Sequence, residues 1–260
     1  MTQLRPDQVP DGWSSGATAY GDNFGVLTRA FAADAVRLAG VTDATEVLDV
    51  AAGTGEATAA ARALGARVTA TDFAEGMVRE LAQRFAGDDA VAVMQMDGQN
   101  LTVPDESFDV VVSMFGLMFF PDAARGLTEM RRVLRPGGRA AIGVWTPDFC
   151  VIQHIGAALR QVLPNPPEFL VPTWAAFAEH LEENVRKAGF AVEMHEVQHH
   201  WDFADPAAFF RSTPVWSPPL QILLQSLPPD RFDAAAAAFA ESVTAAGGLD
   251  AVAPVAIGTR

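Results

Sequence analysis

The sequence contains very little cysteine. Cys150 is the single cysteine among 260 residues, so an internal disulfide and a cysteine-based metal cluster are both excluded. No apolar run approaches the roughly 18 residues that a membrane span needs, although half of the residues are hydrophobic. The first residues also lack the apolar core of a secretion signal. These absences predict a cytoplasmic protein.

Positive charge is scarce as well. Lysine and arginine number 18 against 32 acidic residues, which gives a formal net charge of −14 and a pI near 4.6. Such a surface repels phosphate backbones and anionic lipid, so we expect no nucleic acid and no membrane among the partners. The charge is compatible with a cationic cofactor and a small-molecule acceptor. We expect a monomer or a homodimer.

From residue 46 onward, short apolar runs alternate with helical patterns. The predicted strands are 46–50, 67–72, 90–94, 108–113 and 139–145, and the predicted helices between them are 55–64, 74–85 and 122–134. Repeated strand–helix–strand units predict an α/β fold with a doubly wound, mostly parallel sheet and helices on both faces. Ligands of such sheets bind at the carboxyl ends of the strands, near the point where the winding reverses.

The most informative stretch is 46–58, where an apolar strand turns through a glycine-containing loop into an alanine-rich helix. Glycines in such a turn let a ligand approach the backbone, and the helix N-terminus directs free N–H groups at it. Asp49 places a carboxylate at this turn. Asp72 ends the next strand 19 residues after Gly53, close to the offset of about 20 at which a carboxylate reaches the ribose of a bound nucleoside. Thr58 stands where a dinucleotide motif has a third small residue, which disfavours NAD.

Two further stretches follow predicted strands. Residues 96–101 read Met-Asp-Gly-Gln-Asn-Leu, and residues 108–116 run from a strand into Ser-Met-Phe-Gly. Together with the turn at 132–138, they make the sequence similar to the class I S-adenosylmethionine-dependent methyltransferases over residues 46–146. The small-molecule, quinone-type branch is the most similar. The resemblance implies S-adenosylmethionine as cofactor and a seven-stranded sheet of order 3-2-1-4-5-7-6 with the last strand antiparallel.

The resemblance also implies which residues bind the cofactor. Asp72 would hold the ribose hydroxyls and Asp97 the adenine amino group, while residues 113–115 would line the methionine part. Ala51 replaces the first glycine of the family motif. The implied cofactor-binding residues are Asp49, Ala51, Gly53, Gly55, Asp72, Phe73, Met77, Asp97, Gly98, Gln99, Ser113, Met114 and Phe115. Structural alternatives stay open: Asp72 as a helix cap, Met77 as core, and Asp97 in an Asx-turn.

The catalytic group is less clearly marked, because methyl transfer from a sulfonium depends mainly on alignment and on the exclusion of water. Tyr20, the single tyrosine, precedes the first clear helix, where related proteins often place a tyrosine near the sulfonium. His154 and His180 lie in the predicted cap, and His154 is the second catalytic candidate. Aromatic residues could form an acceptor pocket or the core of the cap. They are Trp145, Phe149, Trp174, Trp201, Phe210 and Trp216.

The remaining segments are less regular. Residues 1–21 are predicted to be irregular and a helix is predicted at 22–39. Helices are also predicted at 149–162, 174–188, 205–212, 218–227 and 229–246, and strands at 191–199 and 251–257. We predict a single methyltransferase domain. Its parts are an N-terminal lid (1–40), a cofactor-binding core (41–147), cap helices (148–188) and C-terminal strands with inserted helices (189–260).

The leading functional hypothesis is methyl transfer to oxygen or carbon of a small apolar or aromatic metabolite. Fold and cofactor do not fix the reaction, so a cofactor-binding protein of the same fold with a non-methylating, cyclase-type reaction is an alternative. An NAD-dependent oxidoreductase is a further alternative that Thr58 and Asp97 disfavour.

Overall fold

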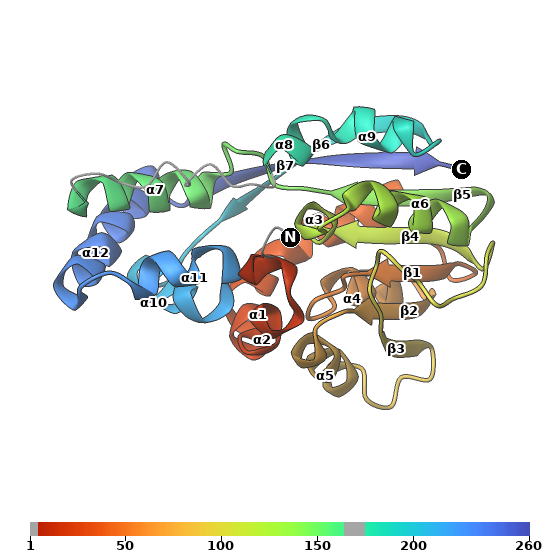
Figure 1. Ribbon diagram of the computed structural model, residues 1–260, viewed down its shortest axis with the longest axis horizontal. Coiled ribbons are helices and arrows are strands. Elements are labelled where there is room, and N and C mark those ends of the chain that lie inside the picture. Colours follow the sequence, from red (N-terminus) through yellow and green to blue (C-terminus); the bar gives the residue numbers. More distant parts are fainter. Residues whose placement is uncertain (1–4, 164–174) are drawn as a thin grey trace.

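The computed structural model describes residues 5–163 and 175–260, and its centre is a seven-stranded sheet with helices on both faces (Figure 1). The strand order is β3-β2-β1-β4-β5-β7-β6. The strands are β1 (Glu46–Val50), β2 (Arg67–Asp72), β3 (Val91–Gln95), β4 (Phe108–Met114), β5 (Leu134–Gly143), β6 (Ala191–Trp201) and β7 (Leu249–Thr259). Among the described strands, β7 runs in the direction opposite to the other six, because it pairs antiparallel with both β5 and β6. The predicted fold class, strand order and antiparallel last strand are all confirmed.

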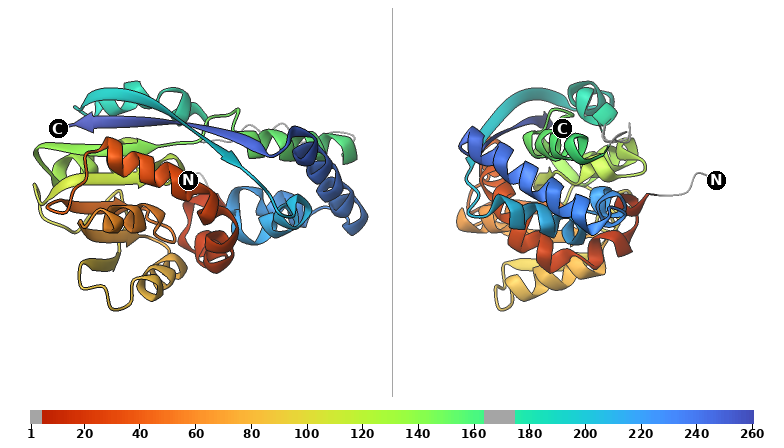
Figure 2. Two further views of the ribbon diagram at one scale, coloured as in Figure 1. Left: turned by 180° about the vertical axis from the view of Figure 1, so that it is seen from behind. Right: turned by 90° about the vertical axis from the view of Figure 1, so that its left-hand side faces the viewer.

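Strand β1 lies at the centre of the sheet, between β2 and β4. Its side chains Val47, Leu48 and Val50 are at most 1% exposed. Because helices cover both faces of a parallel sheet, a central strand is apolar on both sides. Helices α3 (Val26–Leu38) and α4 (Glu56–Ala63) pack together on one face, and α6 (Ala123–Val133) lies on the other (Figure 2).

A second group of helices lies beyond the carboxyl ends of the parallel strands (Figure 1). It comprises α7 (Cys150–Val162), α10 (Pro206–Trp216), α11 (Pro218–Gln225) and α12 (Pro229–Ala246). The last three are inserted between β6 and β7. The remaining described helices outside the N-terminal segment are α5 (Glu75–Arg84), η3 (Leu117–Phe119), α8 (Ala175–Glu179) and α9 (Leu181–Lys187). None of the described helices is long and apolar enough to cross a membrane.

The prediction of an irregular segment at 1–21 is wrong for its described part. The chain there forms η1 (Pro6–Gln8), α1 (Pro10–Ser14), α2 (Ala17–Tyr20) and a π-helical turn, η2 (Gly21–Gly25). These helices are too short to be stable alone. They are held by close packing at both ends. The Gly76 amide of α5 donates to the Ser14 hydroxyl at 3.2 Å, and a Cβ at Gly16 would lie 2.2 Å from the Val215 carbonyl oxygen of α10.

Other boundaries differ in smaller ways. Strand β5 begins at Leu134 rather than 139, because Leu134 pairs with Phe108 before an irregularity that separates it from the Val110–Arg139 pair. The predicted helix 174–188 is interrupted at His180, which gives α8 and α9. Trp174 lies outside the described residues.

Candidate active site

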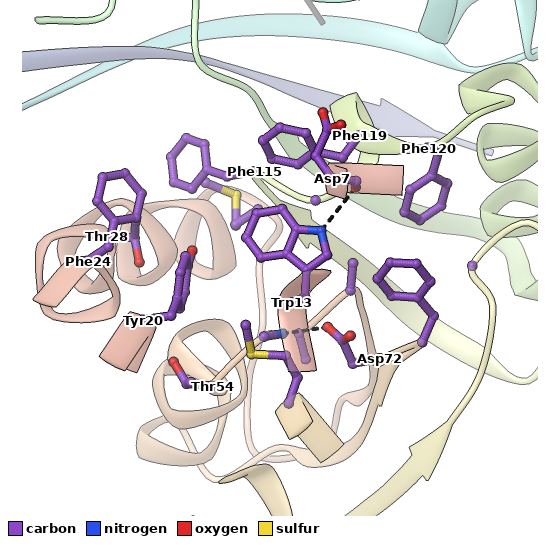
Figure 3. Close-up of a pocket in the computed structure, with 18 of the residues that line it drawn as sticks. Asp7, Trp13, Tyr20, Phe24, Thr28, Thr54, Asp72, Phe115, Phe119 and Phe120 are labelled. Atoms are coloured by element: carbon purple, nitrogen blue, oxygen red, sulfur yellow. Dashed lines mark hydrogen bonds between the residues drawn. The ribbon is translucent and has the colours of Figure 1, made fainter. Parts of the chain in front are cut away.

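A cavity of about 520 Å³ opens at the carboxyl ends of β1, β2 and β4 (Figure 3). Its walls come from three sources: the loops that follow these strands, the N-terminal helices, and the helical group formed by α7, α10 and α11. This volume falls within the range of small-molecule and cofactor sites. The cavity therefore occupies the place where a doubly wound sheet binds its ligand.

The turn between β1 and α4 has the backbone shape that the sequence predicts. Gly53 and Gly55 have φ values of 57° and 90°. Gly55 does not line the cavity but admits the side chains of α5, since a Cβ there would lie 2.7 Å from Leu81. Ala51 also has a positive φ of 57°, which costs a residue with a side chain about 1–2 kcal/mol. A Cβ at Gly116 would lie 2.5 Å from the Ala51 methyl group, so the loops after β1 and β4 meet here.

Asp72 joins this turn to the end of β2. One carboxylate oxygen accepts the Gly53 N–H at 2.9 Å and the other accepts the Ala74 N–H at 2.9 Å. The residue is 5% exposed and lines the cavity. Burial raises the pKa of Asp72 to about 6, against the lowering effect of the backbone hydrogen bonds. The N-cap of α5 is Ala74, so Asp72 is not the helix cap that the alternative interpretation suggested.

Asp49 lies beneath the same turn. It is 2% exposed, and the Thr58 hydroxyl donates to its carboxylate at 2.7 Å. Burial raises the pKa of Asp49 to about 6, and hydrogen bonds from Thr58 oppose this shift. Thr58 thus has a positive role in this turn: it fixes the carboxylate where a dinucleotide motif would have a small residue.

The loop after β3 contributes Asp97, Gly98 and Gln99 to the cavity wall. The Asp97 carboxylate accepts from the Gln99 backbone N–H at 2.9 Å, which is an Asx-turn. The Gln99 side chain donates to Asp97 and accepts from the Asp122 N–H at 2.8 Å, so it is held at both ends. Gly98 has no room for a side chain, because a Cβ would lie 2.5 Å from the ring of Phe120.

The end of β4 supplies Met114 and Phe115, and both line the cavity. Phe115 has a φ of 62°. Ser113 is fully buried and does not line the cavity, and its hydroxyl has no hydrogen-bond partner within the described chain. Phe73 and Met77 line the cavity, but Met77 is also packed against Ala74 in a small core cluster.

Stacked aromatic rings form one part of the cavity, its aromatic end. Trp145 is stacked between Phe115 and Phe149, with ring centroids 3.7 and 4.1 Å apart, and Phe24 stacks on Trp216 at 5.0 Å. All five line the cavity. Of the other predicted pocket aromatics, Trp201 and Phe210 do not line the cavity and pack in the hydrophobic core instead.

Tyr20 lies between the two ends of the cavity (Figure 3). Its ring covers the glycine turn, since a Cβ at Gly53 would lie 3.8 Å from a ring carbon. Burial raises the pKa of the Tyr20 hydroxyl above its ordinary value, and the charges of Glu56 and Asp72 add to this. The hydroxyl therefore keeps its proton at neutral pH. It can donate a hydrogen bond but is a poor base.

The structure does not bring His154 to the cavity, which corrects that expectation. Its Nδ1 lies 2.8 Å from the Ser242 hydroxyl, because this side of α7 faces α12. His180 is exposed beside Glu183 and does not line the cavity either. The sequence pattern showed that these histidines lie on or beside helices but not which neighbour each helix faces.

The described lining includes five acidic residues and no lysine, arginine or histidine. Two of the acids are paired: Glu56 with Arg84 at 2.7 Å, and Asp7 with Arg5 at 3.0 Å. The others are Asp49, Asp72 and Asp97. The field inside the cavity therefore favours a positively charged ligand.

Several lining residues were missed by the sequence interpretation. They are Asp7, Gln8, Pro10, Trp13, Phe24, Thr28, Ala32, Ala52, Thr54, Glu56, Ala57, Gln95, Met96, Gly116, Phe119, Phe120, Pro121, Val151, Ile152, Ser217, Pro219 and Leu220. For the residues around Phe24 a signal existed: Gly21 and Gly25 flank it. A Cβ at either glycine would lie 3.2 or 3.0 Å from Thr54, so this spacing lets the π-helical turn approach the β1–α4 loop closely. For the inserted helices there was no such signal.

Comparison with known families agrees with this site. Residues 48–142 match the family described as a methyltransferase domain. These residues run from β1 to β5 and include every strand end that lines the cavity. Over these residues the chain resembles the S-adenosylmethionine-dependent methyltransferases. S-adenosylmethionine is the cofactor of this class.

The similar curated proteins include demethylmenaquinone methyltransferases. That of Clavibacter sepedonicus is 38% identical over 164 residues, which are 57% of this chain and 66% of that protein. That of Beutenbergia cavernae is 34% identical over 162 residues, which are 60% of this chain and 66% of that protein. The matched part therefore spans just under two thirds of the length of both relatives.

Solved structures show the same fold at low identity. The cyclase SpnF is 18% identical with a TM-score of 0.62, and the match covers 99% of this chain and 97% of SpnF. A Haemonchus contortus N-methyltransferase, solved with S-adenosylhomocysteine, is 17% identical with a TM-score of 0.59, and the match covers 95% of this chain and 57% of that protein. These likenesses concern the fold alone.

Proposed function

We propose that this protein transfers the methyl group of S-adenosylmethionine to oxygen or carbon of a small, uncharged aromatic acceptor, such as a quinol. The observation that carries the proposal is the shape of one cavity. Its acidic end is built on the glycine turn and Asp72, and it continues past Tyr20 into an aromatic end. The names of the demethylmenaquinone methyltransferases support a quinone-type acceptor.

The residues at the acidic end fit the cofactor. Each carboxylate oxygen of Asp72 accepts one backbone N–H and has further lone pairs that can accept hydrogen bonds from the ribose hydroxyls. Gly53 leaves the backbone open to close approach, and Asp97 and Gly98 would receive the adenine. Met114 and Phe115 would line the methionine part. When bound, the cofactor supplies an electrophilic methyl group on a sulfonium.

The residues around the transfer point would act by alignment. The aromatic wall would hold the acceptor ring and keep water out. Because the Tyr20 hydroxyl stays protonated, it would orient the acceptor by donating a hydrogen bond. No histidine or lysine lines the described cavity, and Glu56 and Asp7 there are paired with arginines. We therefore expect the acceptor to provide its own nucleophile, as the acidic hydroxyl or electron-rich carbon of a quinol does.

The test is to incubate the protein with S-adenosylmethionine and the reduced form of a short-chain demethylmenaquinone analogue. We expect S-adenosylhomocysteine and methylated product in equal amounts. Calorimetry should show binding of S-adenosylmethionine and none of NAD. If the cofactor binds and the acceptor is converted without forming S-adenosylhomocysteine, the reaction is of the cyclase type. Binding of NAD in place of S-adenosylmethionine would contradict the proposal entirely.

We further propose that the chain acts as one domain in the cytoplasm, as a monomer or homodimer that does not bind nucleic acid. The net charge of −14 supports the expectation that the protein does not bind nucleic acid. Sedimentation would measure the oligomeric state. A salt-sensitive gel shift with duplex DNA or RNA would contradict the expectation for nucleic acid.

A further inference from the structure

The junction between α10 and α11 forms one wall of the aromatic end of the cavity. Trp216 ends α10, and Pro218 and Pro219 begin α11. Trp216, Ser217, Pro219 and Leu220 line the cavity. This junction belongs to the insertion between β6 and β7 and lies outside the residues that match the methyltransferase family. It can therefore differ between members that share the same cofactor site.

Ser217 has an unusual local environment for its residue type. It occupies the N-cap of α11, where a serine hydroxyl normally accepts a backbone N–H from the second or third helical residue. The second is Pro219, which has no N–H, and the third is Leu220, whose N–H donates to the Ser217 carbonyl oxygen at 3.0 Å. The hydroxyl consequently makes no capping bond.

The Ser217 side chain is free to bind a ligand. It is 8% exposed, and its hydroxyl has no hydrogen-bond partner among the residues that the structure describes. A buried hydroxyl normally has a partner, because an unpaired one loses its hydration without compensation. Since Ser217 lines the cavity, its hydroxyl is available to a ligand bound there.

Two other cavity-lining hydroxyls have no hydrogen-bond partner in the described chain: that of Thr54 at the glycine turn and that of Tyr20. The Tyr20 ring lies 6.4 Å from the Trp216 ring, next to Ser217 in sequence. The two segments are locked together, because the backbone of Gly16 packs directly against Val215 and Trp216. Ser217 and Tyr20 thus line the cavity from two segments that are packed against each other.

We propose that Ser217, together with Tyr20, hydrogen-bonds an oxygen substituent on the aromatic acceptor, and that the α10–α11 junction thereby selects the acceptor. The inference rests on the proposed function of the cavity. Shape alone would admit any flat ring of the right size, whereas a hydroxyl pair distinguishes rings that carry oxygen. The absence of a cation from the described lining adds a second selection, against acceptors with a carboxylate or phosphate.

The experiment measures binding, so that it does not depend on knowing the natural acceptor. The full-length protein is saturated with S-adenosylhomocysteine and titrated with 1-naphthol, 1-methylnaphthalene or 1-naphthoate, which share shape but differ in polarity and charge. Quenching of tryptophan fluorescence reports binding, since Trp145 and Trp216 line the cavity. Ser217→Ala is compared with Ser226→Ala, whose hydroxyl at the end of α11 donates to the Leu223 carbonyl oxygen and does not line the cavity.

We expect the wild type to bind 1-naphthol about 2- to 10-fold more tightly than 1-methylnaphthalene, the range for one neutral hydrogen bond. Ser217→Ala should remove most of this preference without weakening 1-methylnaphthalene, and Ser226→Ala should keep it. An unchanged preference in Ser217→Ala, stronger binding of 1-naphthoate than of 1-naphthol, or no binding of any probe would overturn the inference. S-adenosylhomocysteine binding separates the two proposals: if it is normal, only the acceptor inference fails, and if it is absent, the proposed function fails as well.

Discussion

Replacing Asp72 with alanine tests the centre of the cofactor site. In the structure its carboxylate accepts the N–H groups of Gly53 and Ala74 at 2.9 Å each. With the cofactor present, the same carboxylate is expected to hold the ribose hydroxyls. The substitution therefore changes stability and binding together, and the two effects need separate estimates.

Two opposing contributions set the change in stability. Loss of the carboxylate leaves two buried N–H groups without a partner, at about 1–3 kcal/mol each. It also removes a buried carboxylate whose pKa is raised from 3.8 to about 6, and a shift of that size costs the folded protein about 3 kcal/mol at neutral pH. The net loss of unfolding free energy should therefore be at most about 3 kcal/mol.

The effect on cofactor binding has no such compensation. Loss of the hydrogen bonds from the ribose to the charged group should weaken S-adenosylmethionine binding by about 1.5–3 kcal/mol, or roughly 10- to 150-fold.

Asp88→Ala is the matched control. The Asp88 carboxylate also accepts the N–H two residues ahead, that of Ala90 at 3.0 Å, but it does not line the cavity. Calorimetry should show weaker cofactor binding only for Asp72→Ala, while thermal unfolding confirms that both variants are folded. A folded Asp72→Ala protein that binds S-adenosylmethionine within twofold of wild type would refute the ribose assignment.

Three further outcomes are expected. S-adenosylmethionine affinity should increase from pH 5 to pH 7, because burial raises the pKa values of Asp49 and Asp72 to about 6 and a cation favours their ionised forms. S-adenosylhomocysteine, which lacks the sulfonium charge, should respond less, and equal responses would count against the electrostatic argument. For the same groups the empty folded protein binds more protons than the unfolded chain between about pH 4 and pH 6, so their contribution to the unfolding free energy should decrease as the pH rises through that window. Tyr20→Phe should lower turnover by about 100-fold or more with cofactor binding unchanged, if the hydroxyl orients the acceptor; full activity would leave the ring as packing. In Gly76→Val the new Cβ would lie 2.2 Å from the Ser14 carbonyl oxygen and push the N-terminal helices away from α5. Hydrogen exchange across residues 6–25 should therefore accelerate while the sheet stays protected. An unchanged exchange pattern would show that this contact does not hold the segment.

The sequence is most informative where structure is decided locally. Strands 46–50 and 67–72 are predicted to the residue, because an apolar run followed by a turn sets both ends of a buried strand. The positions of Asp49, Asp72 and Asp97 at one edge follow from the parallel arrangement of the strands that precede them. The fold class alone therefore suffices to predict that these three carboxylates lie together on the cavity wall.

Features that depend on distant contacts are not predictable in this way. The N-terminal helices form because Gly16 and Gly76 allow close docking on α10 and α5, and neither partner is adjacent in sequence. The positive φ of Ala51 is supported by Gly116 on another loop. His154 shows the same limit, since the periodicity of α7 does not reveal that this residue faces Ser242.

The N-terminal helices connect the two ends of the site mechanically. Ser14 holds them to α5, beside the proposed cofactor end, and Gly16 holds them to α10, beside the proposed acceptor end. Tyr20 lies between these contacts and lines the cavity. Because each of these helices has at most five residues, it has little stability apart from its docking contacts. Undocking would therefore open both ends of the cavity together and leave the sheet intact, which is how one short segment can admit both reactants and then exclude water from the place where they meet.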